Sequence, residues 1–158
     1  MPTIELTTNI QAPVQRCFDL SRSIDLHTET TKRTGEQAVA GVTGGLIGLG
    51  ETVTWRAKHF WIRQQLTSRI TAMEAPYHFR DEQIKGAFKK IVHDHYFSRA
   101  GDHTIMKDRF YFESPGGTLG DLFNKLVLTR YLRRFLMERN AVIKEYAESL
   151  EGDRFLSL

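Results

Sequence analysis

Two histidines and two aspartates have the types and the spacing that could support chemistry. His93 and His95 alternate in the segment KKIVHDHYFSR (89–99), so both imidazoles project from one side if that segment is a strand. Asp108 lies in the next segment of the chain and Asp81 in the preceding one. Such a group could be a histidine–carboxylate general base, part of a metal site, or a set of hydrogen-bonding anchors for a ligand.

The turns between these segments decide whether the four side chains meet. The stretch AGDH (100–103) has the composition of a hairpin turn, and a turn there pairs residue 95 with residue 108, so His95 faces Asp108. A preceding turn centred on residue 86 pairs residue 79 with residue 93, so that Asp81 lies diagonal to His93. The rest of this face is apolar, with Phe79, Ile91, Phe97, Met106, Phe110 and Phe112.

Three hypotheses for this cluster stay open. Buried charges are tolerable when they are paired, so a purely structural polar network is the first. The polar end of a ligand pocket is the second, and a weak catalytic pair of His95 and Asp108, suited to enolisation or dehydration, is the third. A third metal ligand beside the His-x-His pair is a guess, so we expect no metal.

The glycine-rich stretch 44–50 interrupts the pattern, with Leu46, Ile47 and Leu49 between its four glycines. It has no lysine in the position that a P-loop requires, and Val53 stands where a dinucleotide fingerprint has its third glycine. We therefore expect no cofactor. The alternatives are a mobile connector, a fixed cap over the edge of the core, and a gate at the mouth of a cavity.

The composition is that of an ordinary globular protein. The chain has 158 residues, 41% hydrophobic and 26% charged, which suits one domain over 1–158. The net charge of +3 is too small to argue for nucleic acid, and no apolar run predicts stable membrane insertion. Cys17 is the single cysteine and the start of the chain does not resemble a signal peptide, so the expected location is cytoplasmic.

Alternating hydrophobicity predicts a succession of strands with a helix after the first. Pro13 opens that helix, and 27–34 has the polar composition of a turn. One face of the strand 51–61 carries Val53, Trp55, Ala57, His59 and Trp61. The predicted strands are 3–10, 36–42, 51–61, 61–73, 76–84, 89–99 and 104–113.

The segment 118–150 is predicted to be helical. Thr118 and Asp121 resemble a capping box. Its apolar residues form two stripes, so we expect a short helix, a break near 127–130 and a long helix. The first stripe is Leu119, Leu122, Phe123 and Leu126; the second is Leu128, Leu132, Phe135, Val142, Ile143, Tyr146 and Leu150.

One charged residue falls within the second stripe. Arg139 lies at its centre, which predicts an ion pair with Asp81 or Asp108. The nearby Arg130, Arg133 and Arg134 fall on the polar side, where a solvated basic face is favoured over membrane or RNA contact.

The order of elements, together with several soft motifs, resembles a known superfamily. The motifs are NIQAPVQRCFDL, GLGETVTWRAKHF, YHFRDEQIKGAFKKIVHDHYF, DRFYFESPGG and LRRFLMERNAVI. Across nearly the whole chain they are similar to the START/birch-pollen-allergen (SRPBCC) superfamily, in its bacterial polyketide cyclase/dehydrase-like branch. The resemblance implies an α+β helix-grip fold, in which a curved antiparallel sheet of about six to seven strands wraps around a long C-terminal helix.

The same resemblance implies an internal apolar cavity. The expected function is binding or carriage of a small hydrophobic molecule that is lipid-, polyketide- or quinone-like. A small cyclase- or dehydratase-type enzyme and a protein-interaction adaptor are the alternatives. The expected ligand-binding residues are Leu46, Ile47, Leu49, Val53, Trp55, His59, Leu66, Phe79, Asp81, His93, His95, Met106, Phe110, Phe135 and Arg139.

Overall fold

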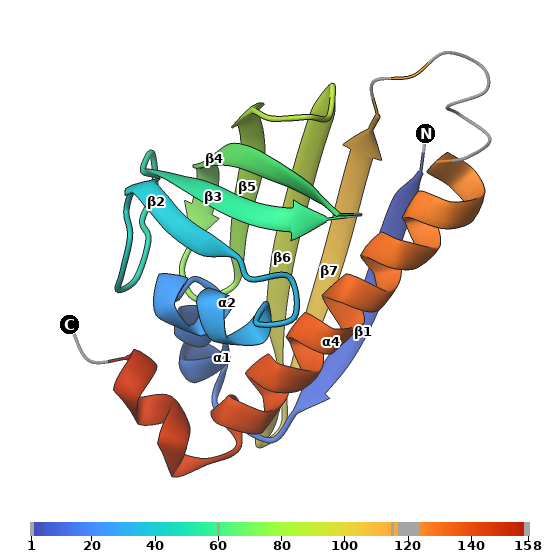
Figure 1. Ribbon diagram of the computed structural model, residues 1–158. Coiled ribbons are helices and arrows are strands. Elements are labelled where there is room, and N and C mark those ends of the chain that lie inside the picture. The colour runs from blue at the N-terminus through green and yellow to red at the C-terminus, as the bar shows by residue number, and fades with distance from the viewer. Residues whose placement is uncertain (1, 60, 115, 117–123, 157–158) are drawn as a thin grey trace.

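A curved antiparallel sheet grips a long helix in the computed structural model, which describes residues 2–59, 61–114, 116 and 124–156 (Figure 1). The strands lie in the order β1-β7-β6-β5-β4-β3-β2. This is the predicted α+β helix-grip arrangement. The strands are β1 (Thr3–Ile10), β2 (Gln37–Gly41), β3 (Thr52–His59), β4 (Ile62–Glu74), β5 (His78–Lys85), β6 (Lys90–Ala100) and β7 (His103–Glu113).

The helices cover the inner face of the sheet. Figure 1 shows α4 running diagonally beside β1 and β7, with α1 and α2 below the curled strands β2 and β3. The helical segments are α1 (Val14–Ser21), α2 (Ile24–Thr30), the π-helical turn η1 (Asn124–Leu128), α4 (Thr129–Ala147) and the 3₁₀ helix η2 (Leu150–Phe155). No helix in the described part of the chain is long and apolar enough to span a membrane.

The second helix corrects one prediction. The segment 27–34 was predicted to be a turn, but α2 continues to Thr30. The Ser23 side chain caps this helix by accepting a hydrogen bond from the Leu26 amide at 3.2 Å. Because Ile24 and Leu26 are buried, tertiary packing adds to the cap and outweighs the modest helix propensity of the threonines that follow.

The registers of the central hairpins place the cluster residues on one face. His95 pairs with Asp108 and His93 with Phe110, as the turn at 100–103 predicted. Asp81 faces His93 directly, whereas a diagonal position was predicted. The β5–β6 turn is centred one residue later than expected, which moves the register by two residues and leaves every side chain on its predicted face.

The β3–β4 turn reverses the prediction for Trp61. This residue was expected to point inward with Trp55, but β3 ends at His59. Trp61 has a φ of 66° and is 89% exposed. A left-handed residue in a hairpin turn interrupts the alternation of the strand, so the side chain leaves the inward face.

The C-terminal helix is more continuous than predicted. The expected break near 127–130 is a change of helix type, because η1 leads directly into α4 at Thr129. Leu150 lies beyond the end of α4 and is 87% exposed, so its place on the buried stripe was wrong. The buried residues of α4 are Leu136, Arg139, Asn140, Ile143 and Ala147.

The polar side of this helix agrees with the prediction. Arg130, Arg133 and Arg134 are exposed. The predicted capping box of Thr118 and Asp121 lies outside the described residues, as do Leu119, Leu122 and Phe123 of the first stripe.

A bulged edge strand brings its neighbour's backbone very close to a glycine. The pairing of β2 with β3 shifts between Ala38 and Ala40, which marks the bulge. Gly41 follows with a φ of 73°, and a Cβ added there would overlap the Thr52 carbonyl oxygen. Both the conformation and the close approach therefore require glycine at this position.

We predict that Gly41→Ala lowers the free energy of unfolding by about 2–4 kcal/mol, because it adds a steric clash to the strain of a positive φ. Gly45→Ala is the matched control: Gly45 has a φ of 71° and nothing within 4 Å of an added Cβ. Strain alone should cost it about 1 kcal/mol. Urea denaturation of both variants measures the difference, and equal losses would contradict the role of the Thr52 contact.

Candidate functional site

A cavity of about 500 Å³ lies between the sheet and the long helix. Well-packed interiors have few voids larger than a water molecule, whereas small-molecule sites have volumes of about 300–1,000 Å³. The void is therefore a specific feature of this fold. Its apolar walls include Val53, Trp55, Leu66, Ile70, Phe79, Ile91, Phe110, Leu132, Phe135 and Leu136.

Most of the residues predicted to contact a ligand line this cavity, and three do not. Leu49 is exposed, and Leu46 forms an isolated bridge with Ser23. Met106 is fully buried under α1, whose Ser21 hydroxyl lies 3.5 Å from its sulfur. The predicted residues that line the cavity are Ile47, Val53, Trp55, His59, Leu66, Phe79, Asp81, His93, His95, Phe110, Phe135 and Arg139.

The glycine-rich stretch is tied to the helices behind it. The Gly45 amide donates to Asp25 at 2.8 Å, and the Gly45 carbonyl accepts from the Ile24 amide at 2.9 Å. Arg22 donates to the Ile47 carbonyl at 3.0 Å, and the Ile47 side chain is buried against the cavity. These bonds favour the fixed cap over the gate.

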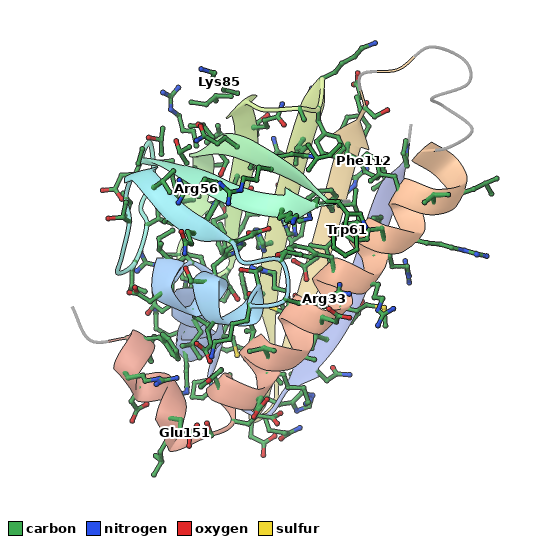
Figure 2. All side chains as sticks on the ribbon, viewed as in Figure 1. Arg33, Arg56, Trp61, Lys85, Phe112 and Glu151 are labelled. Atoms are coloured by element: carbon green, nitrogen blue, oxygen red, sulfur yellow. The ribbon has the colours of Figure 1, made fainter. Side chains whose placement is uncertain are left out.

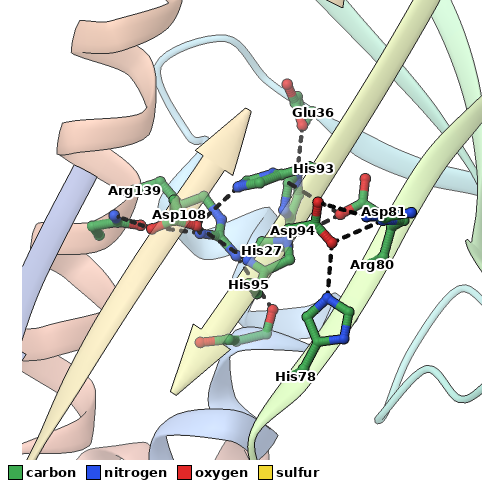
Figure 3. A network of polar contacts seen from close by, with 12 residues as sticks. His27, Glu36, His78, Arg80, Asp81, His93, Asp94, His95, Asp108 and Arg139 are labelled. Carbon is green, nitrogen blue, oxygen red and sulfur yellow. Dashed lines mark hydrogen bonds and ion pairs between the residues drawn. The ribbon is translucent and has the colours of Figure 1, made fainter. Parts of the chain in front are cut away.

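Six polar residues, called here the histidine cluster, lie together at the wall formed by β5, β6, β7 and α4, five of them buried and Asp81 partly exposed (Figure 3). Asp108 accepts hydrogen bonds from His93 Nε2 at 2.8 Å and from Asn140 Nδ2 at 2.6 Å. His95 Nε2 donates to Asp81 Oδ2 at 3.0 Å. The complete cluster is Asp81, His93, His95, Asp108, Arg139 and Asn140.

Both ring nitrogens of His95 lie close to a carboxylate, but only one of them makes a hydrogen bond. Its Nδ1 lies 3.1 Å from Asp108 Oδ1, but the direction is wrong for a hydrogen bond. The contact predicted between His95 and Asp108 is thus an electrostatic approach, and the aligned hydrogen bond of this ring goes to Asp81.

Burial and neighbouring charges decide the protonation of the cluster. Burial would raise the pKa of Asp108, but His93 and His95 hold it well below its usual range. Burial would lower the pKa of His95, but Asp108 and Asp81 on either side raise it. The pKa of His93 is lowered by burial and by the charge of His95, whose ring centroid is 3.8 Å away. These directions favour a positive charge on His95 and a neutral ring at His93, so that His95 and Arg139 together balance the two carboxylates.

Arg139 is buried, as the helical stripe predicted. It forms an ion pair with Asp108, but no hydrogen bond joins the two side chains. Its Nη1 lies 3.7 Å from Asp108 Oδ1. Its hydrogen bonds go to Asn140 Oδ1 at 3.0 Å and to the Ser21 carbonyl at 3.4 Å. The guanidinium thus supports Asp108 mainly through its charge and through Asn140.

Three members of the cluster have the residue types of a metal site. Asp81, His93 and His95 each offer a ligand atom, all within 4.8 Å of one another. A metal ion would have to lie near the plane of both rings, yet the ring centroids are 3.8 Å apart and the rings are tilted at 34° to each other. The rings would have to rotate and give up a hydrogen bond to Asp81 before sharing an ion, so this geometry favours a hydrogen-bond network.

A second polar group, called here the glutamate cluster, also borders the cavity. Glu36 is buried and lies 2.6 Å from His27 Nε2 and 3.3 Å from His59 Nε2. His59 Nδ1 is 2.6 Å from the Tyr131 hydroxyl, and the His27 ring packs on Trp55 with centroids 4.1 Å apart. The Glu36 carboxylate thus joins α2 to β3, and His59 extends the cluster to Tyr131 on α4.

Sequence analysis missed His27, Glu36, Tyr131 and Asn140. His27 follows the buried Ile24 at helical spacing, which could have identified it. Glu36 begins the predicted strand 36–42, where a charged residue gives no sequence signal of burial. Asn140 belongs to the buried stripe of α4, which was drawn through Val142.

On the outer face of the sheet, a third group joins Asp94 to His78 and Arg80, away from the cavity.

Comparisons with known proteins identify the fold. No protein-family model matches the sequence, and no similarity to a curated protein reaches significance. A START superfamily protein from Mycobacterium smegmatis matches with a TM-score of 0.70 and 9% identity, over 92% of this chain and 97% of that one. Major latex-like protein 151 from Panax ginseng matches with a TM-score of 0.68 and 17% identity, over 94% and 98%. A protein from Thermus thermophilus matches with a TM-score of 0.70 and 16% identity, over 90% and 97%.

The chain therefore has the SRPBCC-type fold that its motifs predicted. At these identities the likeness concerns the fold, and function must be argued from the site.

We predict that Asp108→Asn destabilises the protein more than Arg139→Met. In Asp108→Asn, the donors of His93 and Asn140 face a neutral amide, and Arg139 loses the negative charge on β7. We expect this change to cost about 3–5 kcal/mol of unfolding free energy. Arg139→Met leaves Asp108 with its aligned hydrogen bonds and should cost less than about 2 kcal/mol. Urea midpoints provide the measurement, and the reverse order would show that Asp108 depends chiefly on the guanidinium.

We predict that the free energy of unfolding falls in acid because Glu36 becomes protonated. Burial would raise its pKa, but His27 and His59 lower that pKa to about 2, from an ordinary value of 4.5. The unfolded chain then binds more protons than the folded one between these values, so the contribution is full above pH 4.5 and is lost as the pH falls towards 2. A shift of this size corresponds to about 3 kcal/mol.

The measurement is the free energy of unfolding of the wild type and of Glu36→Gln between pH 6 and pH 2. The difference between the two proteins should shrink as the pH falls. A difference that stays constant over this range would mean that Glu36 is not held ionised by its histidines.

Proposed function

We propose that the protein binds and carries a small hydrophobic molecule in the cavity between sheet and helix. The observation that carries this proposal is the cavity itself, about 500 Å³ in volume and lined mainly by aliphatic and aromatic side chains. An adaptor that used the fold as a rigid surface would gain nothing from such a void. An apolar ligand would supply the dispersion contacts that the side chains of the cavity wall lack while the cavity is empty.

The two polar clusters indicate where hydrogen-bonding groups of the ligand could bind. The histidine cluster borders the cavity from β5 to β7, and the glutamate cluster borders it from β3 and α4. Asp81 on β5 pairs with Ile70 of β4, whereas His59 on β3 pairs with Ile62 of the same strand, so the two clusters lie at different places along the cavity wall. A lipid-, polyketide- or quinone-like molecule with an apolar body and a hydrogen-bonding group at one or both ends fits this distribution.

The geometry supports binding over catalysis. A general base must direct a free ring nitrogen or carboxylate oxygen at the substrate. The Nε2 of His95 donates to Asp81, its Nδ1 is buried 3.1 Å from Asp108, and Asp108 itself is fully buried, so neither residue presents an exposed base to the cavity. Asp81, which is about a quarter exposed, remains as an acceptor for a ligand hydroxyl.

We expect native mass spectrometry of freshly purified protein to show a co-purified apolar molecule, which identifies the ligand class. Incubation of that molecule with wild type and with His95→Ala should give binding without product. Turnover by the wild type that is lost in the variant would replace the carrier hypothesis with a cyclase-type enzyme.

A fluorescent probe tests the cavity without the natural ligand. We predict that wild type binds the neutral dye N-phenyl-1-naphthylamine and that Leu66→Trp, which fills the cavity from β4, weakens this binding at least about tenfold. Ile84→Trp, at an exposed position of β5, is the control and should bind normally. Equal dye binding by all three proteins would place the dye outside the cavity.

A further inference from the structure

The β3–β4 turn displays large apolar side chains to solvent. Trp61 is 89% exposed and Ile62 is 61% exposed. The φ of 66° at Trp61 holds this side chain away from the inward face of β3. A tryptophan this exposed, next to an exposed isoleucine, contributes nothing to the core and marks a surface that meets something apolar.

Cations surround this turn. The described residues that line a groove beside Trp61 include five lysines and arginines and no carboxylate. Two of the five are paired with acids outside the groove: Lys32 with Glu29 at 2.6 Å and Arg33 with Glu138 at 3.1 Å. The basic groove is formed by Lys32, Arg33, Arg56, Lys58 and Arg63 (Figure 2 labels Trp61, Arg33 and Arg56).

Three of these cations keep their charge available. Among the described residues, Arg56, Lys58 and Arg63 have no carboxylate within ion-pair distance. Lys58 lies over the Trp61 ring, 5.5 Å from its centroid, and Arg56 bonds to the neutral Gln37 at 3.2 Å. Apolar side chains and uncompensated cations therefore share one surface.

The basic groove adjoins the ligand cavity. Ala57 and Tyr131 line both spaces. His59, two residues before Trp61 in the chain, bonds to Tyr131 inside the cavity. A molecule leaving the cavity past Tyr131 would thus emerge beside the exposed turn.

We propose that the Trp61–Ile62 turn and the basic groove form a docking surface for a bilayer that contains anionic phospholipid. Trp61 and Ile62 enter the interface between headgroups and acyl chains, and Arg56, Lys58 and Arg63 bind lipid phosphates. A bilayer is favoured over a nucleic acid because the turn presents an aliphatic side chain with its aromatic one. The proposal rests on the carrier function for its purpose, but docking is measurable without any cavity ligand.

Sedimentation with vesicles is the test. Wild type should bind vesicles of phosphatidylcholine and phosphatidylglycerol (70:30), with binding weakened by 0.5 M NaCl, and should not bind pure phosphatidylcholine vesicles. Lys58→Glu/Arg63→Glu should reduce the partition coefficient at least about 25-fold, since each basic residue near the surface contributes about fivefold. Trp61→Ala should reduce it about tenfold at unchanged charge.

A matched control separates the groove from net charge. Arg99→Glu/Lys107→Glu changes two exposed residues of β6 and β7 by the same total charge and should retain vesicle binding. Thermal unfolding confirms that each variant is folded. The proposal is overturned if the two double variants lose binding equally, if Trp61→Ala binds like wild type, or if wild type binds single-stranded poly(U) RNA and no vesicle.

Failure of docking and failure of the carrier function are distinguishable. The dye assay reports on the cavity in the same variants, and Lys58→Glu/Arg63→Glu should keep its dye affinity while losing vesicles. Loss of both would mean that the turn supports the cavity wall, and docking would then be rejected as its primary role.

Discussion

The buried carboxylate of Asp108 is the constraint on which the rest of the site depends. It lies on β7 and accepts hydrogen bonds from β6 through His93 and from α4 through Asn140. A charge this deep is tolerable only while these partners stay in place, so it fixes the distance between the long helix and the sheet. That fixed distance explains how a void can persist between two apolar surfaces that would otherwise close upon each other. The polar network acts as a spacer as well as a wall of the cavity.

In the glutamate cluster, a second buried carboxylate joins elements elsewhere on the cavity wall. Glu36 holds His27 from α2 and His59 from β3, and His59 reaches Tyr131 on α4. Both clusters satisfy most of their own hydrogen bonds, so a guest need not bring a charge to be accepted. Selectivity would then come from the shape of the aromatic walls and from the few acceptors, such as Asp81, that face the void.

The sequence was informative where local rules decide the geometry. A short turn of recognisable composition sets the register of β6 and β7, so the pairing of His95 with Asp108 could be predicted. The β5–β6 register was wrong by two residues, but the two-residue period of a strand preserved the face of Asp81. The position of Arg139 followed from helical periodicity in the same way.

The misses have a common physical cause. Trp61 left its predicted face through one backbone dihedral that no side-chain pattern encodes. Glu36 is buried by contacts from α2 and β3, so only the folded arrangement reveals its partners. Met106 was assigned to the cavity by its strand face alone, and which part of a face is covered depends on where α1 lies. Leu49 was assigned through the gate interpretation of the glycine-rich stretch, and it is exposed. Periodicity thus predicts faces well, and it does not predict what covers them.

The bulge in β2 has a consequence for how copies of this protein meet. An open seven-stranded sheet has two edges whose free amides and carbonyls can recruit a strand from another molecule. At one edge β2 is short, and its bulge and Gly41 interrupt the straight ladder that an added strand would need. At the other edge α4 reaches over β1, where Lys144 donates to the Asn9 carbonyl at 2.6 Å. A protein that holds a hollow interior, and so forgoes some packing energy, is thereby protected against edge-to-edge aggregation.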